Sequence, residues 1–241
     1  MLNVNNITAV IFAAGLGTRL YPLTANRPKA MVCYEGKPLL QHALEKVAAA
    51  GICNVVVNVH HFPDQIIDFV HTFPFEGQVR ISDERAYLRD TAGGLKFADP
   101  LFGDSDILLL YNVDILSSID LRKMVARHVD SGAEVTLAVR DRQTARYFVF
   151  ERENMRLCGW KNIKTGESIM PVSPHDPVAL AFSGIHVMNR SFIKKLTTVE
   201  KSSLSPIYLQ LINSCSIYGY QHQDDNWMDV GKYEEFRNIL T

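Results

Sequence analysis

The stretch ITAVIFAAGLGTRL, residues 7–20, begins as a continuous apolar run and then breaks into a loop with two glycines and an arginine. An apolar run without polar alternation is typical of a parallel strand that is covered by helices on both faces. In an open parallel sheet, ligands bind beyond the carboxyl ends of the strands. The stretch therefore predicts an open α/β sheet with a ligand site at the glycine loop.

Strand and helix patterns alternate through the first 140 residues. The predicted strands cover residues 7–14, 54–60, 79–84, 106–112 and 134–139. The predicted helices, which have apolar residues at helical spacing, cover residues 38–50, 64–73, 91–98 and 120–129. Asp120 is the predicted N-cap of the last of them. This alternation predicts an α/β fold with a Rossmann-like mixed, mostly parallel sheet flanked by helices.

The rhythm changes after residue 140. A hairpin around Glu153 and Asn154 and a strand over residues 178–188 are followed by short helical patterns from Arg190 and Leu204. No linker rich in Pro, Gly or Ser, no repeat and no low-complexity segment divides the chain. We predict a single domain over residues 1–241, with a nucleotide-binding half at 1–140 and a mixed half at 141–241.

Composition and charge exclude several classes of protein. The formal net charge is −1, so the chain lacks the broad positive footprint of a nucleic-acid or membrane-surface binder. The N-terminal apolar run is too short to cross a bilayer and has no basic start. The four cysteines are scattered and have no metal-type spacing. We expect a cytoplasmic protein without nucleic-acid or membrane partners; its oligomeric state stays open.

The loop after the first strand has the chemistry of an anion site. Gly15 and Gly17 allow the backbone N–H groups to surround an anion closely. Arg19 adds a planar fork for phosphate oxygens and Lys29 a mobile positive charge. Leu20 stands where a dinucleotide fingerprint needs its third glycine, and no Walker A pattern occurs here.

Residues 15–29 closely resemble the signature of the sugar-1-phosphate nucleotidylyltransferases, G-x-G-T-R-x-x-P-x-T-x-x-x-P-K. The matching fixed positions are Gly15, Gly17, Thr18, Arg19, Pro22, Thr24, Pro28 and Lys29. The resemblance continues through GKPLLQHALEKVAAAGICNVVVNVHH, LRDTAGGLKFA, LLLYNVDI, FSGIHVM and WMDVGKYEEF. Among members, the chain looks most like the short bacterial N-acetylmuramate-1-phosphate uridylyltransferases and mannose-1-phosphate guanylyltransferases.

The resemblance implies the nucleotide-diphospho-sugar transferase type of fold and a Mg²⁺-dependent reaction. A nucleotidyl group passes from an NTP to a sugar 1-phosphate, giving an NDP-sugar, as for cell-wall precursors, and pyrophosphate. The leading pairs are UTP with N-acetylmuramate 1-phosphate and GTP with mannose 1-phosphate. Transfer from CTP to phosphocholine and a non-catalytic nucleotide- or sugar-phosphate-binding regulator remain as alternatives. An NAD-binding oxidoreductase is disfavoured by Leu20.

The attacking phosphate is already an anion, which agrees with the lack of a recognisable Ser-His-Asp or Cys-His arrangement in the sequence. The resemblance and the loop chemistry give a catalytic role to Arg19 at the leaving pyrophosphate and to Lys29 at the α-phosphate. The implied metal ligands are Asp114 and Asp229. The family strand commonly has a glycine beside the first acidic residue, where this chain has Val113.

The remaining expectations concern the two substrate pockets. The expected nucleotide-binding residues are Ala13, Ala14, Gly15, Gly17, Thr18, Asn58, Thr91, Gly93 and Gly94, with His60 and Glu84 as further candidates near the base. The expected sugar-phosphate-binding residues are Asn112, Lys161, Ser183 and Gly184. Many relatives carry a phosphate-binding lysine in a Glu-Lys-Pro motif; this chain lacks the motif, and Lys161 is the expected substitute. Trp160 is expected in the core, with stacking on a sugar face as the alternative.

Overall fold

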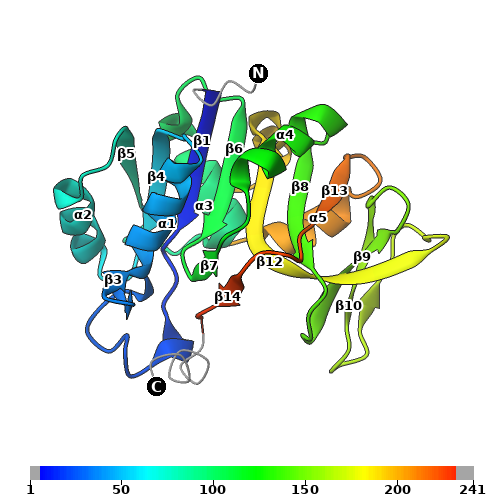
Figure 1. Ribbon diagram of the computed structural model, residues 1–241, viewed down its shortest axis with the longest axis horizontal. Coiled ribbons are helices and arrows are strands. Elements are labelled where there is room, and N and C mark those ends of the chain that lie inside the picture. Colours follow the sequence, from blue (N-terminus) through cyan, green and yellow to red (C-terminus); the bar gives the residue numbers. More distant parts are fainter. Residues whose placement is uncertain (1–5, 232–241) are drawn as a thin grey trace.

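A computed structural model describes residues 6–231 as one central sheet with helices on both faces (Figure 1). The sheet contains β1 (Ile7–Phe12), β4 (Asn54–Val59), β5 (Gln78–Asp83), β6 (Ile107–Asn112), β8 (Val135–Arg140), β9 (Arg146–Glu151), β10 (Leu157–Asn162), β11 (Ser168–Ile169), β12 (Pro177–Asn189) and β13 (Ile217–Gln221). The helices are α1 (Leu39–Ala49), α2 (Pro63–Thr72), α3 (Asp90–Ala98), α4 (Leu121–Ser131) and α5 (Leu204–Leu211). Short 3₁₀ turns are η2 (Thr18–Leu20), η3 (Lys29–Met31), η4 (Asp99–Phe102) and η5 (Arg190–Lys195).

The strand order is β11-β10-β9-β12-β6-β1-β4-β5, with β8 paired to β12 and β13 paired to β8. The strands β5, β4, β1 and β6 run parallel, whereas β12 runs antiparallel to β6, β8 and β9. The long strand β12 therefore joins the parallel first half of the chain to the more antiparallel second half. The predicted mixed sheet flanked by helices is confirmed.

The apolar run of β1 is explained by burial on two faces. Ile11 packs into the core layer that includes Leu44 of α1 and Val125 of α4, whereas Val10 packs into the layer formed with α3 and α5. Successive residues of a strand point to opposite faces, so both must be apolar when helices cover both faces. Figure 1 shows α1 and α4 in front of the sheet and α3 and α5 behind it.

The predicted element boundaries are correct to within a few residues. The first strand ends at Phe12, so residues 13–14 already belong to the loop. The N-cap predicted at Asp120 is confirmed, because its side chain accepts a hydrogen bond of 2.9 Å from the Lys123 N–H. None of the helices described between residues 6 and 231 is long and apolar enough to span a bilayer.

Several short strands have no counterpart in the sequence prediction. Besides β11 and β13, they form two small ribbons, β2 (Cys33–Tyr34) with β3 (Lys37–Pro38) and β7 (Ile115–Ser117) with β14 (Trp227–Asp229). In the second ribbon Asp229 stands opposite Ile115, the residue after Asp114. This pairing returns the end of the described chain to the carboxyl edge of β6.

Candidate active site

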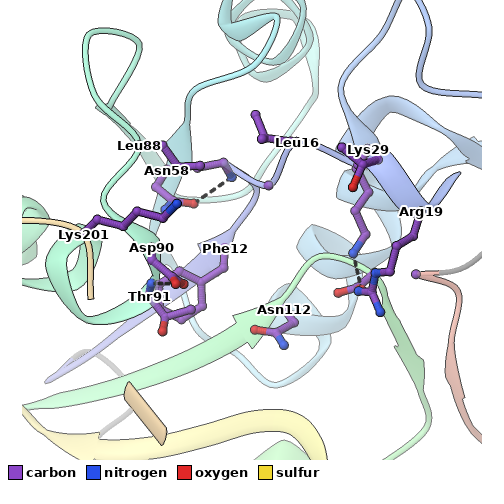
Figure 2. A pocket seen from close by; sticks show the side chains of 16 residues that line it. Phe12, Leu16, Arg19, Lys29, Asn58, Leu88, Asp90, Thr91, Asn112 and Lys201 are labelled. Atoms are coloured by element: carbon purple, nitrogen blue, oxygen red, sulfur yellow. Dashed lines mark hydrogen bonds and ion pairs between the residues drawn. The ribbon is translucent and has the colours of Figure 1, made fainter. Parts of the chain in front are cut away.

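A cavity of about 450 Å³ lies at the carboxyl ends of β1, β4 and β6 (Figure 2). We call it the first cavity. Its lining residues are Phe12, Ala14, Gly15, Leu16, Gly17, Thr18, Arg19, Lys29, Asn58, Leu88, Asp90, Thr91, Asn112, Asp114, Lys201 and Gly231. Figure 2 shows Arg19 beside Lys29 on one side, Asn58 and Thr91 on the other, and Asn112 between the two groups. Most of the predicted nucleotide-binding and catalytic residues therefore share one cavity.

The two glycines of the loop serve different purposes. Gly17 has a left-handed backbone with φ +67°, and a Cβ there would lie 2.8 Å from Cγ2 of Thr24. The Thr24 hydroxyl donates a hydrogen bond of 2.9 Å to the Gly17 carbonyl and so fixes the turn. A Cβ on Gly15 would meet no atom within 4 Å. Gly15 is therefore not required by packing, and its bare backbone leaves space for a ligand in the cavity.

Asn58 connects the loop to the neighbouring strands. Its Oδ1 accepts hydrogen bonds from the N–H groups of Ala13 at 2.7 Å and Ala14 at 3.2 Å. Its Nδ2 donates to Oε1 of Glu84 at 2.9 Å. Asn58 lines the first cavity, but its amide is used to hold the loop. The backbone N–H groups of Ala13 and Ala14, predicted to bind nucleotide, are turned toward Asn58.

Glu84 is a buried carboxylate, only 2% exposed, that links β5 to the start of α3. Its Oε2 accepts a hydrogen bond of 3.1 Å from the Arg89 N–H. Burial raises the pKa of Glu84, while the hydrogen bonds from Asn58 and Arg89 oppose that rise. A Cβ on Gly94 would lie 2.6 Å from Oε1 of Glu84, and one on Gly93 would lie 2.1 Å from the Glu200 carbonyl oxygen.

The two glycines of α3 therefore have packing roles in this structure. Neither Gly93 nor Gly94 lines the first cavity, although Thr91 and Asp90 do. A glycine at a helix start allows a nucleobase to approach the backbone, which is the contact predicted for Gly93 and Gly94. The structure shows instead that glycine lets the helix approach Glu84 and the segment around Glu200. A direct contact of these two residues with nucleotide remains a prediction.

Charged side chains from distant parts of the chain meet around Gly231. Lys29 Nζ forms an ion pair with Oδ2 of Asp114, and both side chains are mostly buried. The Gly231 N–H donates a hydrogen bond of 2.8 Å to Oδ1 of Asp229. A Cβ on Gly231 would lie 2.6 Å from Asp114 Oδ2, 2.7 Å from Asp229 Oδ1 and 3.3 Å from Arg19 Nη2. Two carboxylates and two cations thus surround one point.

The electrostatics of this cluster show that the two carboxylates interact. Burial is the main cause that raises the pKa of Asp229, and the nearby charge of Asp114 raises it further. The Gly231 N–H, Lys29 and Arg19 act in the opposite direction. Over residues 6–231, no group of three or more His, Cys, Asp or Glu side chains is placed to hold a metal ion. A cation here would therefore depend on the carboxylate pair.

A second cavity of about 750 Å³ lies between α5 and the sheet strands β9, β10 and β11. Its lining residues are Arg142, Thr144, Arg146, Tyr147, Phe148, Trp160, Glu167, Ile169, Phe182, Ser203, Ser205, Pro206, Leu209, Gln210 and Asp229. Asp229 is thus adjacent both to the charged cluster of the first cavity and to the second cavity. Trp160, expected in the core, lies on the cavity wall.

Lys161, predicted to bind the sugar phosphate, lines neither the first nor the second cavity, and its contact with the sugar phosphate remains a prediction. Lys161 follows Trp160 in β10, and adjacent residues of a strand point to opposite faces of the sheet. Because Trp160 lines the second cavity, Lys161 points away from it. The sequence could not show this direction, since both residues fall in a segment without a clear alternating pattern.

Ser183, predicted to bind the sugar phosphate, makes its side-chain hydrogen bond within the protein, and a contact with the sugar phosphate remains a prediction. It is fully buried, and its hydroxyl shares a hydrogen bond of 2.8 Å with Nε2 of His222. Nδ1 of His222 in turn lies 2.8 Å from Oδ1 of Asp225. A Ser-His-Asp chain, which the sequence did not reveal, therefore exists, but its serine has no access to a substrate. Burial lowers the pKa of His222, although Asp225 opposes this change.

Gly184 shapes the wall behind Asn112. Its φ is +79°, within the irregular pairing of β12 with β8 between Phe182 and His186. A Cβ on Gly184 would lie 2.6 Å from Ile115 Cγ1 and 3.2 Å from Asn112 Nδ2. Glycine is therefore required by the fold at this position. Of the four predicted sugar-side residues, only Asn112 lines one of the two cavities.

The family model described as nucleotidyl transferase matches residues 8–241. The chain belongs to the nucleotidyl transferase family. Together with relatives named as mannose-1-phosphate guanyltransferase and N-acetylmuramate alpha-1-phosphate uridylyltransferase, this match confirms the resemblance to the sugar-1-phosphate nucleotidylyltransferase family.

Two named proteins are similar in sequence to this chain. The chain is 28% identical over 97% of its length to a putative mannose-1-phosphate guanyltransferase of Sulfolobus acidocaldarius, and spans 62% of that protein. It is 41% identical over 44% of its length, and 45% of the relative, to the N-acetylmuramate alpha-1-phosphate uridylyltransferase of Caulobacter vibrioides.

The fold is also shared with solved structures. The crystal structure of HddC from Yersinia pseudotuberculosis, complexed with GMP-PN, has a TM-score of 0.75 and 19% sequence identity, covering 96% of this chain and 97% of that one. At this level of identity, the likeness establishes a shared fold alone.

Sequence reasoning missed two members of the nucleotidyl transferase site. Lys201 lines the first cavity from an exposed segment between η5 and α5, where no pattern distinguishes it from other surface lysines. Gly231 lies beside Arg19 and the carboxylates of Asp114 and Asp229, in a space that a larger residue would fill. A glycine two residues after Asp229 was the available signal for a close approach.

Proposed function

We propose that the protein transfers a nucleotidyl group from an NTP to a sugar 1-phosphate. The single observation that supports this proposal best is the meeting of Arg19, Lys29, Asp114 and Asp229 at the glycine loop. In the reaction, an oxygen of the acceptor phosphate forms a bond to the α-phosphorus. The bond from that phosphorus to the bridging oxygen breaks, and pyrophosphate leaves with the electron pair.

Positioning and charge are sufficient for this chemistry, because the nucleophile is already anionic. The N–H groups around Gly15 and Gly17 bind the triphosphate, and Arg19, which has no ion-pair partner within residues 6–231, balances charge on the departing pyrophosphate. Lys29 acts at the α-phosphate from its place beside Asp114. Holding the two reactants in line can supply about 7–11 kcal/mol of the barrier reduction, and preorganised cations add to it.

The carboxylates of Asp114 and Asp229 fit a hard divalent cation, which we propose is Mg²⁺. Carboxylate oxygens are the protein ligands that Mg²⁺ takes, usually one or two of them with substrate phosphates completing its shell. Burial and, to a lesser extent, the charge of Asp114 raise the pKa of Asp229, and a cation between the two carboxylates would relieve their repulsion, which supports the assignment. When bound, Mg²⁺ would supply charge stabilisation to the phosphates.

The relatives support two candidate substrate pairs. One relative is named as a guanyltransferase for mannose 1-phosphate and the other as a uridylyltransferase for N-acetylmuramate 1-phosphate. We therefore propose either GTP with mannose 1-phosphate or UTP with N-acetylmuramate 1-phosphate. The alternatives are transfer from CTP to phosphocholine and a regulator that binds the same ligands without turnover.

The test is pyrophosphate release with Mg²⁺ over a matrix of four NTPs and a panel of acceptors that includes mannose and N-acetylmuramate 1-phosphates and phosphocholine. One productive pair, with turnover lowered at least about 100-fold by Asp114→Asn, is the expected result. Asp130→Asn, an exposed carboxylate on α4, serves as the matched control. Silence throughout, with NTP binding retained, would instead favour the regulator.

A further inference from the structure

The floor of the second cavity is formed by one face of β9, β10 and β11. Phe148 and Trp160 stand opposite each other in the pairing of β9 with β10, and Ile169 stands opposite Trp160 in the next pair. Residues opposite each other share a face, as do residues two apart on a strand. Arg146, two residues before Phe148, therefore lies on the same face, and all four residues line the cavity.

Arg146 is an exposed cation on this floor. No Asp or Glu of residues 6–231 forms an ion pair with it. Glu167, which lines the same cavity, lies across Asn162, which pairs with Arg146 on one side and donates its N–H to the Glu167 carbonyl on the other. The backbones of Arg146 and Glu167 are therefore two strand spacings apart, about 10 Å. Arg146 is therefore available to an anionic ligand.

Arg142 is held at the other end of the cavity, next to the strand that carries Asp229. Its Nη2 donates a hydrogen bond of 3.1 Å to the Phe182 carbonyl. Its guanidinium carbon lies 4.5 Å from the centre of the Trp227 ring. Trp227 begins β14, which ends at Asp229, and Asp229 lines the same cavity. The guanidinium of Arg142 and the carboxylate of Asp229 thus line the same cavity, whereas Lys161 does not line it.

We propose that the second cavity binds two anionic groups of one acceptor, a sugar 1-phosphate with a carboxylate on its ring substituents. Arg142 binds the phosphate in place of the missing lysine, and Arg146 binds the carboxylate. The sugar ring lies against Trp160 between them. This inference rests on the proposed function, because it takes the acceptor to be a sugar 1-phosphate.

The chemistry favours an acidic sugar over a neutral one. A guanidinium and a carboxylate form paired charge-assisted hydrogen bonds, which lysine or a neutral group cannot reproduce. A neutral sugar would leave Arg146 without a partner on the floor of a largely apolar pocket. Glu167 repels an acidic group placed on its own side, which confines the carboxylate to the side of Arg146.

The experiment compares two acceptors that differ only in the carboxylate-bearing group. N-acetylmuramate 1-phosphate carries a lactyl ether that N-acetylglucosamine 1-phosphate lacks. We expect the protein to favour the acidic acceptor in kcat/KM, and Arg146→Met to lower that value about 10- to 100-fold for the acidic acceptor alone. Arg146→Lys should restore part of the loss. Lys164→Met, which removes an exposed cation after β10, is the matched control.

Two results would overturn the two-anion site while leaving the transferase function intact: equal use of both acceptors, or an equal loss on both in Arg146→Met. Absence of turnover with every acceptor and every NTP would instead contradict the proposed function. In that case calorimetric binding of the same two acceptors to the protein and to Arg146→Met decides the inference separately. Equal dissociation constants for the two acceptors would refute it.

Discussion

Single residues in this protein have roles that depend on the direction of the side chain as much as on its type. Lys161 is the residue that sequence similarity favours for the acceptor phosphate, yet it lies on the face of β10 opposite to Trp160. We expect Lys161→Met to change kcat/KM for the acceptor by less than about twofold, because it removes no group from either cavity. A loss of tenfold or more in kcat/KM for the acceptor, measured by pyrophosphate release, would indicate that Lys161 binds the acceptor phosphate.

The glycines of the loop allow a second prediction at this scale. Gly17→Ala places a side chain at φ +67° and against Thr24, so the free energy of unfolding should fall by at least about 1–2 kcal/mol. Gly15→Ala has open space for its methyl group, so the free energy of unfolding should change by less than about 0.5 kcal/mol relative to the unsubstituted protein. It should instead raise the KM for NTP.

Urea unfolding of both glycine variants, beside NTP kinetics of Gly15→Ala, measures these effects. A Gly15→Ala variant with unchanged KM would show that the nucleotide does not approach the backbone at this residue. The comparison separates the glycine needed for folding from the one needed for binding.

At the scale of elements, the buried pair of Asn58 and Glu84 joins the loop after β1 to β4, β5 and α3. Glu84→Gln replaces one of two accepting oxygens with a donor, so one hydrogen bond to Asn58 or Arg89 is lost. We expect the free energy of unfolding to fall by about 1–3 kcal/mol. Chemical denaturation measures it, with Glu76→Gln, an exposed site, as control; equal stability of the two variants would contradict the role.

The alternation of long strands and helices could be predicted from sequence because each element has its own periodic pattern. Asp120 was recognised as an N-cap for the same local reason. The pairing of β7 with β14 could not be predicted, since each has only three residues and more than a hundred positions separate them. Asp114 and Asp229 were proposed together from resemblance; no local signal brings them together.

The sequence predicted the candidate site least well in the second half of the chain, where the direction of each side chain decides its role. Ser183 and Gly184 lie in β12, a strand that changes partners and pairs irregularly around them. A residue there can face a cavity or the core with no change in local pattern. The sequence therefore pointed to the second half of the chain for the proposed acceptor site but not to Arg142 and Arg146.

For the whole molecule, buried histidines should make stability depend on pH. His186 is buried and bonded to the Tyr208 hydroxyl at 2.9 Å, and burial lowers the pKa of His186 to about 3. Burial also lowers the pKa values of His128 and His222. The unfolded chain, with a histidine pKa near 6.5, therefore binds more protons than the folded protein between about pH 3 and 6.5.

Stability should accordingly be lost as the pH falls through this window. His186 alone should contribute a loss of about 2 kcal/mol between pH 7 and pH 5, at 1.36 kcal/mol per unit of pKa difference. Urea midpoints at the two pH values measure it. His186→Gln should show a smaller difference between the two values than the unsubstituted protein, and an unchanged difference would contradict the assignment.

The order of the chain has a consequence for how activity arises. Asp114 follows a strand of the parallel half, whereas Asp229 reaches it only when β14 pairs with β7. A ribosome delivers the glycine loop, both cations and Asp114 long before it delivers Asp229. Lys201 and Gly231, which also line the first cavity, are likewise made late, so this site is complete only after most of the chain has been synthesised. On the proposed role of the carboxylate pair, a chain that ends before Asp229 should therefore not consume NTP, because Asp114 has no partner carboxylate until β14 pairs with β7.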